Sequence, residues 1–194
     1  MMRPADRRLP TTIDGRGMLG LLAIVAVGAL VMMGRVRLLV LPSTERFLLV
    51  SLLFGAMLVG CLLVPVAPGT RRLHPAVVVA AGIVALGLAA RASGRPVSSP
   101  FGGWAIALGI LAAVAEEALF RRVAYAALEP AGALVAIGAT SLLFALVHLP
   151  LYGLATFPVD LGAGLLFGWQ RWASGSWRTS AGTHVAANLL VMLR

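Results

Sequence analysis

The chain has 194 residues, of which 60% are hydrophobic and 12% are charged, whereas about a quarter of the residues of an ordinary soluble domain are charged. A soluble fold of this size could not bury so much apolar surface, so the composition excludes a soluble globular domain. The net charge of +9 comes from 16 basic residues, all of them arginine; they lie singly or in pairs between apolar stretches, which is typical of membrane-helix ends and argues against nucleic-acid binding.

Apolar stretches of about 17 to 25 residues recur along the chain, and a helix of this length crosses a hydrocarbon core of roughly 30 Å. Backbone groups find no water to bond inside a bilayer, so these stretches predict transmembrane helices. We expect an all-α, polytopic membrane helix bundle of about seven transmembrane helices, with six or eight as alternatives. The expected spans, separated by arginine, glycine and proline, are 18–34, 46–67, 73–91, 103–128, 131–149, 154–172 and 177–193.

Segment 1–17 is polar and rich in arginine, proline and glycine, which predicts a short N-terminal tail. The apolar run after it lacks a convincing small-residue cleavage site, so we expect a retained anchor and not a signal peptide. By the positive-inside rule the arginines of the tail predict a cytoplasmic N-terminus, although Arg35, Arg37 and Arg46 would then lie on the other side.

The first three spans, within 18–98, contain no ionisable residue deep inside them, so we expect accessory helices that pack and anchor. The chemistry is expected in a helix bundle formed by residues 99–194.

The fourth span carries four charged residues within seven positions, namely Glu116, Glu117, Arg121 and Arg122. On a lipid-facing helix they would cost about 10 kcal/mol, at on the order of 3 kcal/mol each, so they must face protein, water or one another. Glu117 and Arg121 have the spacing and order of a favourable helical ion pair. Glu116 projects about 100° away from Glu117, which predicts that it points freely into a cavity.

Two further pairs of residues continue this pattern. Phe144 and His148 lie four apart on the fifth span, and His184 and Asn188 lie four apart on the seventh, so each pair shares one helix face. If the fourth and fifth helices form a hairpin, Glu116 and His148 differ in depth by only about 6 Å. A carboxylate, two imidazoles and a carboxamide are therefore predicted to converge on one polar pocket.

Structural roles compete with this interpretation. His184 or Asn188 alone would serve equally well as an interhelical hydrogen bonder, and Glu117 with Arg121 is better explained as a structural ion pair than as a catalytic one. Asp160, within the sixth span, is expected to face the bundle interior, but nothing in the sequence assigns it a role.

Taken together, E-E-A-L-F-R at 116–121, F-A-L-V-H at 144–148 and H-V-A-A-N at 184–188 resemble a known signature. It is the ordered set EExxxR, FxxxH and HxxxN/D of the CPBP intramembrane proteases, the Abi-like family of CAAX proteases and bacteriocin-processing enzymes. Each motif alone is weak, but the three in order are specific, and the resemblance covers about residues 100–194. Arg122 departs from the family pattern, which usually has glycine after the motif arginine.

The resemblance implies a glutamic intramembrane endopeptidase, a hydrolase that needs no cofactor. Glu116, helped by His148, would activate a water for attack on the peptide bond, and His184 and Asn188 would stabilise the oxyanion. Low dielectric raises the basicity of a carboxylate, and one oxyanion donor contributes about 3 to 4 kcal/mol, so the chemistry suits these residue types. The supporting residues would be Glu117, Arg121 and Phe144.

The family cleaves C-terminal peptides of prenylated proteins, leader peptides or C-terminal sorting segments, which implies a membrane-associated or lipidated protein or peptide as substrate. The absence of lysine, with abundant alanine, arginine, glycine and valine, is typical of a GC-rich prokaryotic genome. We therefore expect an integral protein of a prokaryotic cytoplasmic membrane, and favour a sorting segment or propeptide over eukaryotic-type prenyl processing. The oligomeric state is left open.

Three alternatives stay open. Zinc held by Glu116, His148 and His184 would make a metal-dependent version of the same protease, although H-E-x-x-H is absent. A catalytically idle membrane binding or immunity protein would keep the fold, although decay usually removes charges that are costly to bury. A proton-coupled transporter would use the same polar groups, but no inverted repeat is evident.

The absence of Gly-x-Gly-Asp and Gly-x-Ser-Gly argues against aspartyl and rhomboid-like serine proteases.

Overall fold

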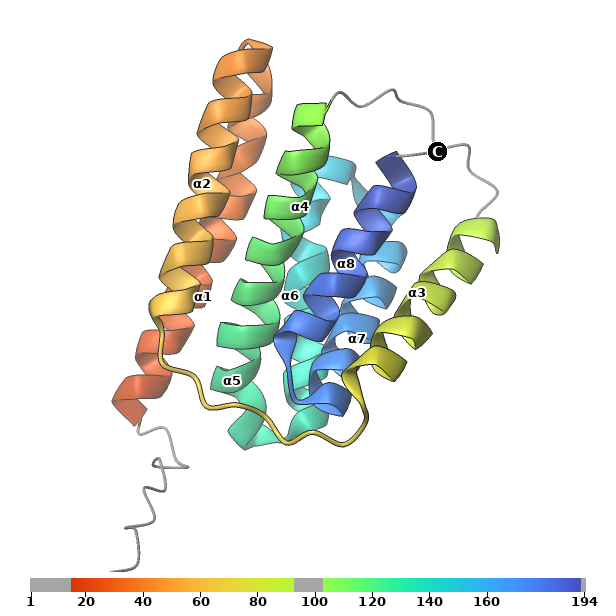
Figure 1. The fold of residues 1–194 in the computed structure, drawn as a ribbon. Helices are drawn as coiled ribbons and strands as arrows, with labels where there is room; N and C mark the ends of the chain where they lie inside the picture. Colours follow the sequence, from red (N-terminus) through yellow and green to blue (C-terminus); the bar gives the residue numbers. More distant parts are fainter. Residues whose placement is uncertain (1–14, 93–102, 193–194) are drawn as a thin grey trace, which may run out of the picture.

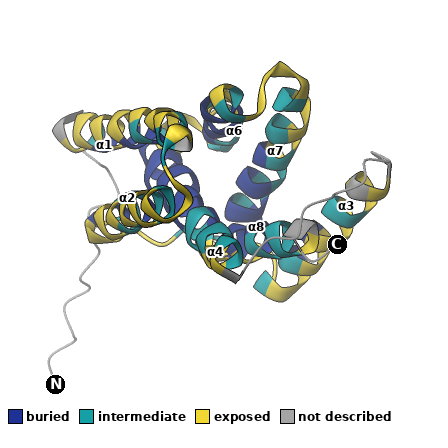
Figure 2. Cartoon of the chain, turned by 90° about the horizontal axis from the view of Figure 1, so that it is seen from above, coloured by how far each residue is buried: buried dark blue, intermediate teal, exposed yellow. Residues whose placement is uncertain are grey.

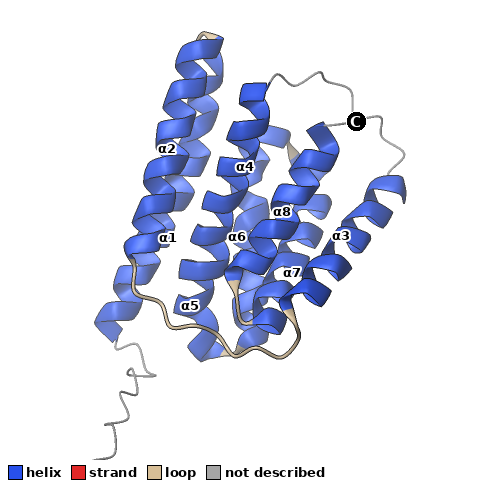
Figure 3. Cartoon of the chain, in the orientation of Figure 1, coloured by secondary structure: helices blue, strands red, loops and turns tan. Residues whose placement is uncertain are grey.

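The computed structural model describes residues 15–92 and 103–192, and every regular element in these two segments is helical (Figure 3). The expected all-α class is therefore confirmed. Of the expected polar tail, residues 1–14 lie outside the described residues, and the last three already belong to the first helix. The long helices are α1 (Gly15–Gly34), α2 (Ser43–Leu63), α3 (Pro75–Ala92), α4 (Gly103–Glu117), α6 (Ala133–Tyr152), α7 (Phe157–Ser174) and α8 (Trp177–Met192).

Shorter helices extend some of the long ones, and we call each continuous run of helix a rod. The π-helix η2 (Ala118–Ala124) and the short α5 (Tyr125–Leu128) continue α4 as one rod, and the 3-10 helix η1 (Arg35–Val40) continues α1. The 3-10 helices η3 (Glu129–Ala131) and η4 (Leu154–Thr156) lie in the turns before α6 and α7. A π-helix inside a longer helix is rare and often marks a functional site.

Two helices end at other positions than the sequence predicted, α2 because of a proline and α6 at a glycine. α2 was expected to reach residue 67 but ends at Leu63, because a residue before proline is driven out of the helical region and Val64, before Pro65, is extended with φ −68° and ψ 125°. A break was expected around Pro150, but α6 continues to Tyr152 and ends where Gly153 takes a positive φ of 78°. Proline in the last turn removes one backbone donor without preventing that turn from forming.

The rods run alternately up and down, so that the beginning of α1, the α2–α3 loop, α5 and the α7–α8 turn all lie at one end (Figure 1). We call this the α5 end; η4 and the α1–α2 turn lie at the opposite, η4 end. The rod of α4, η2 and α5 is central. It contacts α2 on one side and α8 on the other, and α3 lies outermost against α7 and α8 (Figures 1 and 2).

The outer surface of the bundle is apolar. Exposed faces of α1, α2 and α3 surround a buried centre (Figure 2), and Leu30, Leu52 and Leu134 are 68%, 68% and 86% exposed. Soluble monomers rarely expose so many large apolar side chains together. Gly17–Leu38, Ser43–Leu63 and Ala133–Tyr152 are long and apolar enough to cross a membrane, and Pro75–Ala89 is a shorter apolar helix. The chain is an integral membrane protein; the number of seven crossings stays a prediction.

Two glycines allow α6 and α7 to approach closely. A Cβ at Gly164 would lie 3.0 Å from Ser141 Cα, and a Cβ at Gly168 would lie 3.0 Å from Ile137 Cγ2. The two glycines are four residues apart and share one helix face, the small-xxx-small pattern by which membrane helices pack their backbones together. This contact sets the distance from α7 to the polar residues of α6.

Candidate active site

Three polar side chains meet in the interior of the bundle. Glu116, near the end of α4, is 4% exposed. His148 of α6 has its Nε2 atom 3.7 Å from Glu116 Oε2, and His184 of α8 has its Nε2 atom 4.0 Å from the same oxygen. Both separations are too long for direct hydrogen bonds. The structure thus brings together the carboxylate and the two imidazoles, as predicted.

The other ring nitrogen of each histidine determines which atom faces Glu116. His148 Nδ1 lies 2.7 Å from the Phe144 carbonyl oxygen, one turn earlier on α6. His184 Nδ1 lies 3.2 Å from Glu117 Oε1. A carbonyl or carboxylate oxygen only accepts hydrogen bonds, so Nδ1 is the donor in both rings. The two Nε2 atoms are therefore the ones directed at Glu116.

Glu116 has a second partner that the sequence analysis missed. Arg35, in η1 directly after α1, is 7% exposed, and its Nη1 atom donates to Glu116 Oε1 at 2.9 Å. The expectation that Glu116 points freely into a cavity is therefore wrong. Arg35 follows the first expected span, 18–34, and the accessory role of the first three spans stays a prediction. A buried carboxylate is stabilised by a cation, and the long arginine side chain supplies one from a distant helix. In the sequence, Arg35 is indistinguishable from Arg37, which is exposed.

Glu117 and Arg121 form a second polar pair, which contacts the first group through His184. Both are fully buried, with Arg121 Nε 3.6 Å from Glu117 Oε2, so the expected ion pair is present. Arg121 Nη2 donates to the Gly164 carbonyl at 2.9 Å, and the guanidinium lies 4.9 Å from the centre of the Phe144 ring. The pair ties η2 to α7 and holds the carboxylate that His184 contacts.

Aromatic rings pack against the imidazoles of both His148 and His184. Phe144 and Tyr152 lie one turn to either side of His148 on α6, with ring centres 4.5 Å and 5.7 Å from the imidazole. Phe167 of α7 stacks on His184 with ring centres 4.8 Å apart and an interplanar angle of 21°. Phe144 had been predicted as a supporting residue. The spacing of four residues between His148 and Tyr152 was a usable signal, whereas no signal pointed to Phe167.

Asn188 and Asp160 have other contacts. Asn188, one turn beyond His184, donates from Nδ2 to the Gly109 carbonyl at 3.1 Å and so ties α8 to α4. Asp160, in the first turn of α7, interacts electrostatically with His148. Its buried Oδ2 atom has no hydrogen-bond partner within the described ranges.

Arg122, which departs from the signature, acts at the end of α2. Its Nη2 atom donates to the Val64 carbonyl at 2.7 Å, and its Nη1 atom donates to the Cys61 carbonyl. The last carbonyls of a helix have no partner within it, so this guanidinium caps α2.

Within residues 15–92 and 103–192, no three histidine, cysteine or acidic side chains are grouped so as to hold a metal ion. Glu116, His148 and His184 have suitable side-chain chemistry for zinc. However, one Glu116 oxygen already bonds Arg35. The absence of a cofactor stays a prediction.

Residues 98–190 match the family model of the type II CAAX prenyl endopeptidases, Rce1-like. This segment belongs to the Rce1-like family. The resemblance to the CAAX proteases is thereby confirmed, and the Rce1-like domain contains Glu116, His148 and His184. Membership implies a peptidase, hence a hydrolase, that works within the membrane. Arg35 comes from outside the Rce1-like domain. Neither the curated proteins nor the solved structures include a match to the chain.

Proposed function

We propose that this chain is an intramembrane endopeptidase in which Glu116 and His148 activate a water for attack on a peptide bond. The observation that carries the proposal is the convergence of two imidazole Nε2 atoms on Glu116 Oε2, at 3.7 Å and 4.0 Å. A carboxylate beside an imidazole inside a low-dielectric bundle is a suitable general base. The Rce1-like family supports the reaction class, peptide hydrolysis.

The two carboxylate oxygens of Glu116 would have different roles in the reaction. Arg35 holds Oε1, which leaves Oε2 to take the proton of the attacking water while His148 Nε2 orients that water. The water oxygen bonds to the carbonyl carbon, and negative charge develops on the carbonyl oxygen. When the tetrahedral intermediate breaks down, the proton held by Glu116 passes to the leaving amine.

His184 is proposed to stabilise the oxyanion. To donate from Nε2 it must carry a proton there as well as on Nδ1, and Glu117, which contacts Nδ1, would balance the resulting charge. Asn188 lies on the same face of α8 one turn further and is proposed as the second donor, which requires its amide to leave the Gly109 carbonyl.

The proposed substrate is the C-terminal segment of a membrane-associated or lipidated protein in a prokaryotic cytoplasmic membrane. CAAX prenyl endopeptidases act on prenylated protein ends, which makes a prenylated peptide the first substrate to try. Sorting segments and leader peptides are the other two classes in the proposal.

The proposal is tested with protein reconstituted in lipid and three peptides: a farnesylated CAAX end, the same peptide without the lipid, and a C-terminal sorting segment. Products are identified by mass spectrometry. Glu116→Gln and His148→Ala should each lower the cleavage rate by about 10²- to 10⁴-fold, because general-base assistance is lost. Glu45→Gln, which changes an exposed glutamate at the start of α2, should retain the wild-type rate. A metal chelator should have no effect.

Three results would contradict the mechanism. Chelator sensitivity that zinc restores would show a metalloprotease. Undiminished cleavage by Glu116→Gln would show that Glu116 is not the base. Peptide binding by the wild type without cleavage of any of the three peptides would favour the idle binding protein.

A further inference from the structure

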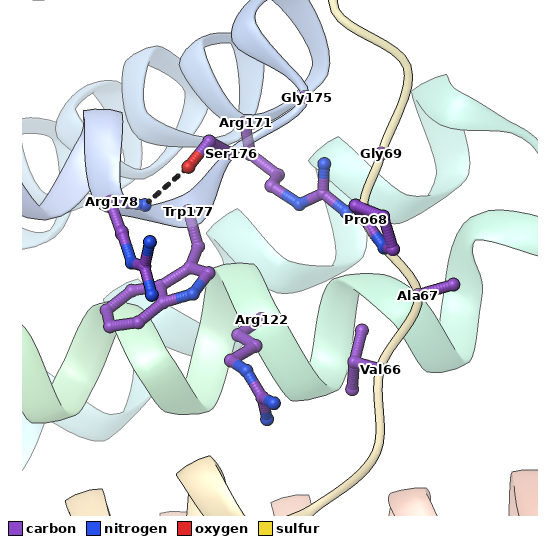
Figure 4. A pocket seen from close by; sticks show the side chains of 10 residues that line it. All are labelled: Val66, Ala67, Pro68, Gly69, Arg122, Arg171, Gly175, Ser176, Trp177 and Arg178. Atoms are coloured by element: carbon purple, nitrogen blue, oxygen red, sulfur yellow. Dashed lines mark hydrogen bonds between the residues drawn. The ribbon is translucent and has the colours of Figure 1, made fainter.

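A pocket of about 270 Å³ lies at the α5 end of the bundle, and none of the residues that line it is Glu116, His148 or His184. Figure 4 shows its lining side chains. Its walls are the chain at 66–69, the α7–α8 turn with the start of α8 at 175–178, and the side chains of Arg122 and Arg171. These segments come from four parts of the sequence. The endopeptidase mechanism uses none of them.

The lining of this pocket is strongly basic. Arg122, Arg171 and Arg178 belong to it, and no acidic residue does. Among the described residues, none of these three arginines forms an ion pair with a carboxylate. Arg171 interacts electrostatically with the exposed Glu129 and, more weakly, with a further cation, Arg72. Glu129 does not line the pocket, so the three arginines are the charged groups that a ligand there would meet.

Several of the arginine donors are available to a ligand. The Arg171 side chain is buried at 3% exposure, and its Nε atom donates to the Arg121 carbonyl at 3.1 Å. Its two Nη groups have no hydrogen-bond partner in the described part of the chain, and the same holds for the whole guanidinium of the exposed Arg178. Neither Nη atom is fully enclosed, so both can be reached from the pocket, where an anion would supply acceptors.

Glycines shape the walls. Gly175 has a φ of +70°, which favours glycine, and a Cβ there would lie 2.6 Å from the Gly69 carbonyl oxygen. The Gly69 N–H donates to the Gly175 carbonyl at 3.2 Å, and a Cβ on Gly69 would collide with Arg171 Nη1. The loop and the turn are thus held together by the backbone, and the Arg171 guanidinium lies in the notch that Gly69 leaves.

We propose that this pocket binds the phosphate group of an anionic phospholipid. The planar guanidinium fork matches phosphate oxygens in a bidentate manner, and basic pockets between membrane helices are suited to lipid headgroups. Trp177 lines the pocket, and tryptophan is enriched at the membrane–water interface. The pocket lies where the helices end, and the ends of membrane-spanning helices lie near the headgroups of a bilayer. The proposal does not depend on the proteolytic activity.

The test is the affinity of the full chain in detergent for short-chain phosphatidylglycerol, short-chain phosphatidylcholine and inorganic phosphate, titrated by native mass spectrometry. The informative variant is Arg178→Gln, because this exposed side chain has no partner in the described segments and its loss should not disturb the fold. The matched control is Arg71→Gln, an exposed arginine at the same end that does not line the pocket.

We expect phosphatidylglycerol to bind most tightly and its affinity to fall roughly tenfold in Arg178→Gln, the effect of losing charged hydrogen bonds. Arg71→Gln should stay within about twofold of wild type. Equal binding of the two lipids, or an equal loss in both variants, would show a diffuse charge effect and overturn the proposal. Inorganic phosphate binding as tightly as phosphatidylglycerol would show a site for free phosphate and overturn the lipid assignment.

Discussion

The two oxygens of Glu116 lie in different surroundings. Oε1 bonds the Arg35 guanidinium, whereas Oε2 faces the imidazoles of His148 and His184. Burying an ion pair brings little net stability, but removing one partner leaves an uncompensated charge in the interior. Arg35 is thus expected to matter for the charge state and the position of Glu116.

Replacing Arg35 with alanine should lower the free energy of unfolding by about 3 to 5 kcal/mol, because Glu116 loses its buried cation. The double variant Arg35→Ala, Glu116→Ala should lose at least about 1 kcal/mol less than the sum of the two single variants. Reversible unfolding in mixed micelles gives all three values.

The control for this cycle is Arg37→Ala, since Arg37 lies in the same short helix and is exposed. It should change the free energy of unfolding by no more than about 0.5 kcal/mol. Strictly additive effects of the Arg35 and Glu116 variants would contradict the pairing.

The close packing of α7 against α6 is expected to depend on Gly164. Gly164→Ala would push a Cβ to within 3.0 Å of Ser141 Cα, and backbone cannot move aside as a flexible side chain can. We expect a loss of about 1 to 3 kcal/mol in the free energy of unfolding. Gly162→Ala, on the same helix with nothing within 4 Å, should be neutral or slightly stabilising. Equal behaviour of the two variants would mean that the helices do not pack through Gly164.

The end of α2 is expected to depend on a side chain from another rod. Arg122→Met keeps an unbranched stem but removes the donors to the Cys61 and Val64 carbonyls. We expect a loss of about 1 to 3 kcal/mol in unfolding free energy. Arg71→Met serves as the comparison, because Arg71 is exposed. Thermal unfolding in detergent with no difference between the two variants would refute the capping role.

The whole molecule has an uneven distribution of arginine. Residues at the α5 end include Arg71, Arg72, Arg122, Arg171 and Arg178, and the arginine-rich segment 1–17 precedes α1, which begins at this end (Figure 1). The η4 end has Arg35, Arg37, Arg46 and Arg91, and by chain order Arg95, between α3 and α4, and Arg194, after α8, add to it. The α5 end still has more arginines, and Arg35 is already paired with Glu116. The positive-inside rule therefore predicts that the α5 end lies in the cytoplasm, together with the N-terminus.

This orientation can be tested because Cys61 is the only cysteine and is buried. In a Cys61→Ala background, Leu154→Cys places a thiol at the η4 end and Glu129→Cys places one at the α5 end, both at exposed positions. A membrane-impermeant maleimide should label Leu154→Cys in intact bacterial cells and Glu129→Cys only after permeabilisation. Labelling of permeabilised cells controls for reactivity, and the reverse pattern would invert the orientation.

Helical class and the approximate helix bounds followed from the sequence because they depend on local properties. Hydrophobic length, the cost of burying charge, and proline and glycine act within one segment, and a spacing of four residues determines which side chains share a helix face. For this reason the convergence of Glu116, His148 and His184, and the pairing of Glu117 with Arg121, could be predicted.

Other contacts between distant segments were decided by the tertiary structure alone. Arg35 and Arg37 are equivalent in local sequence, yet only Arg35 reaches Glu116, because the packing of α1 against the central rod directs one side chain inward. The basic pocket likewise requires the α2–α3 loop to pass the α7–α8 turn, through glycine contacts that no periodicity encodes. By itself the sequence determined which residues lie together on one face of each helix. Which residues meet across helices depended on close packing, since shape complementarity between separate segments leaves no local pattern.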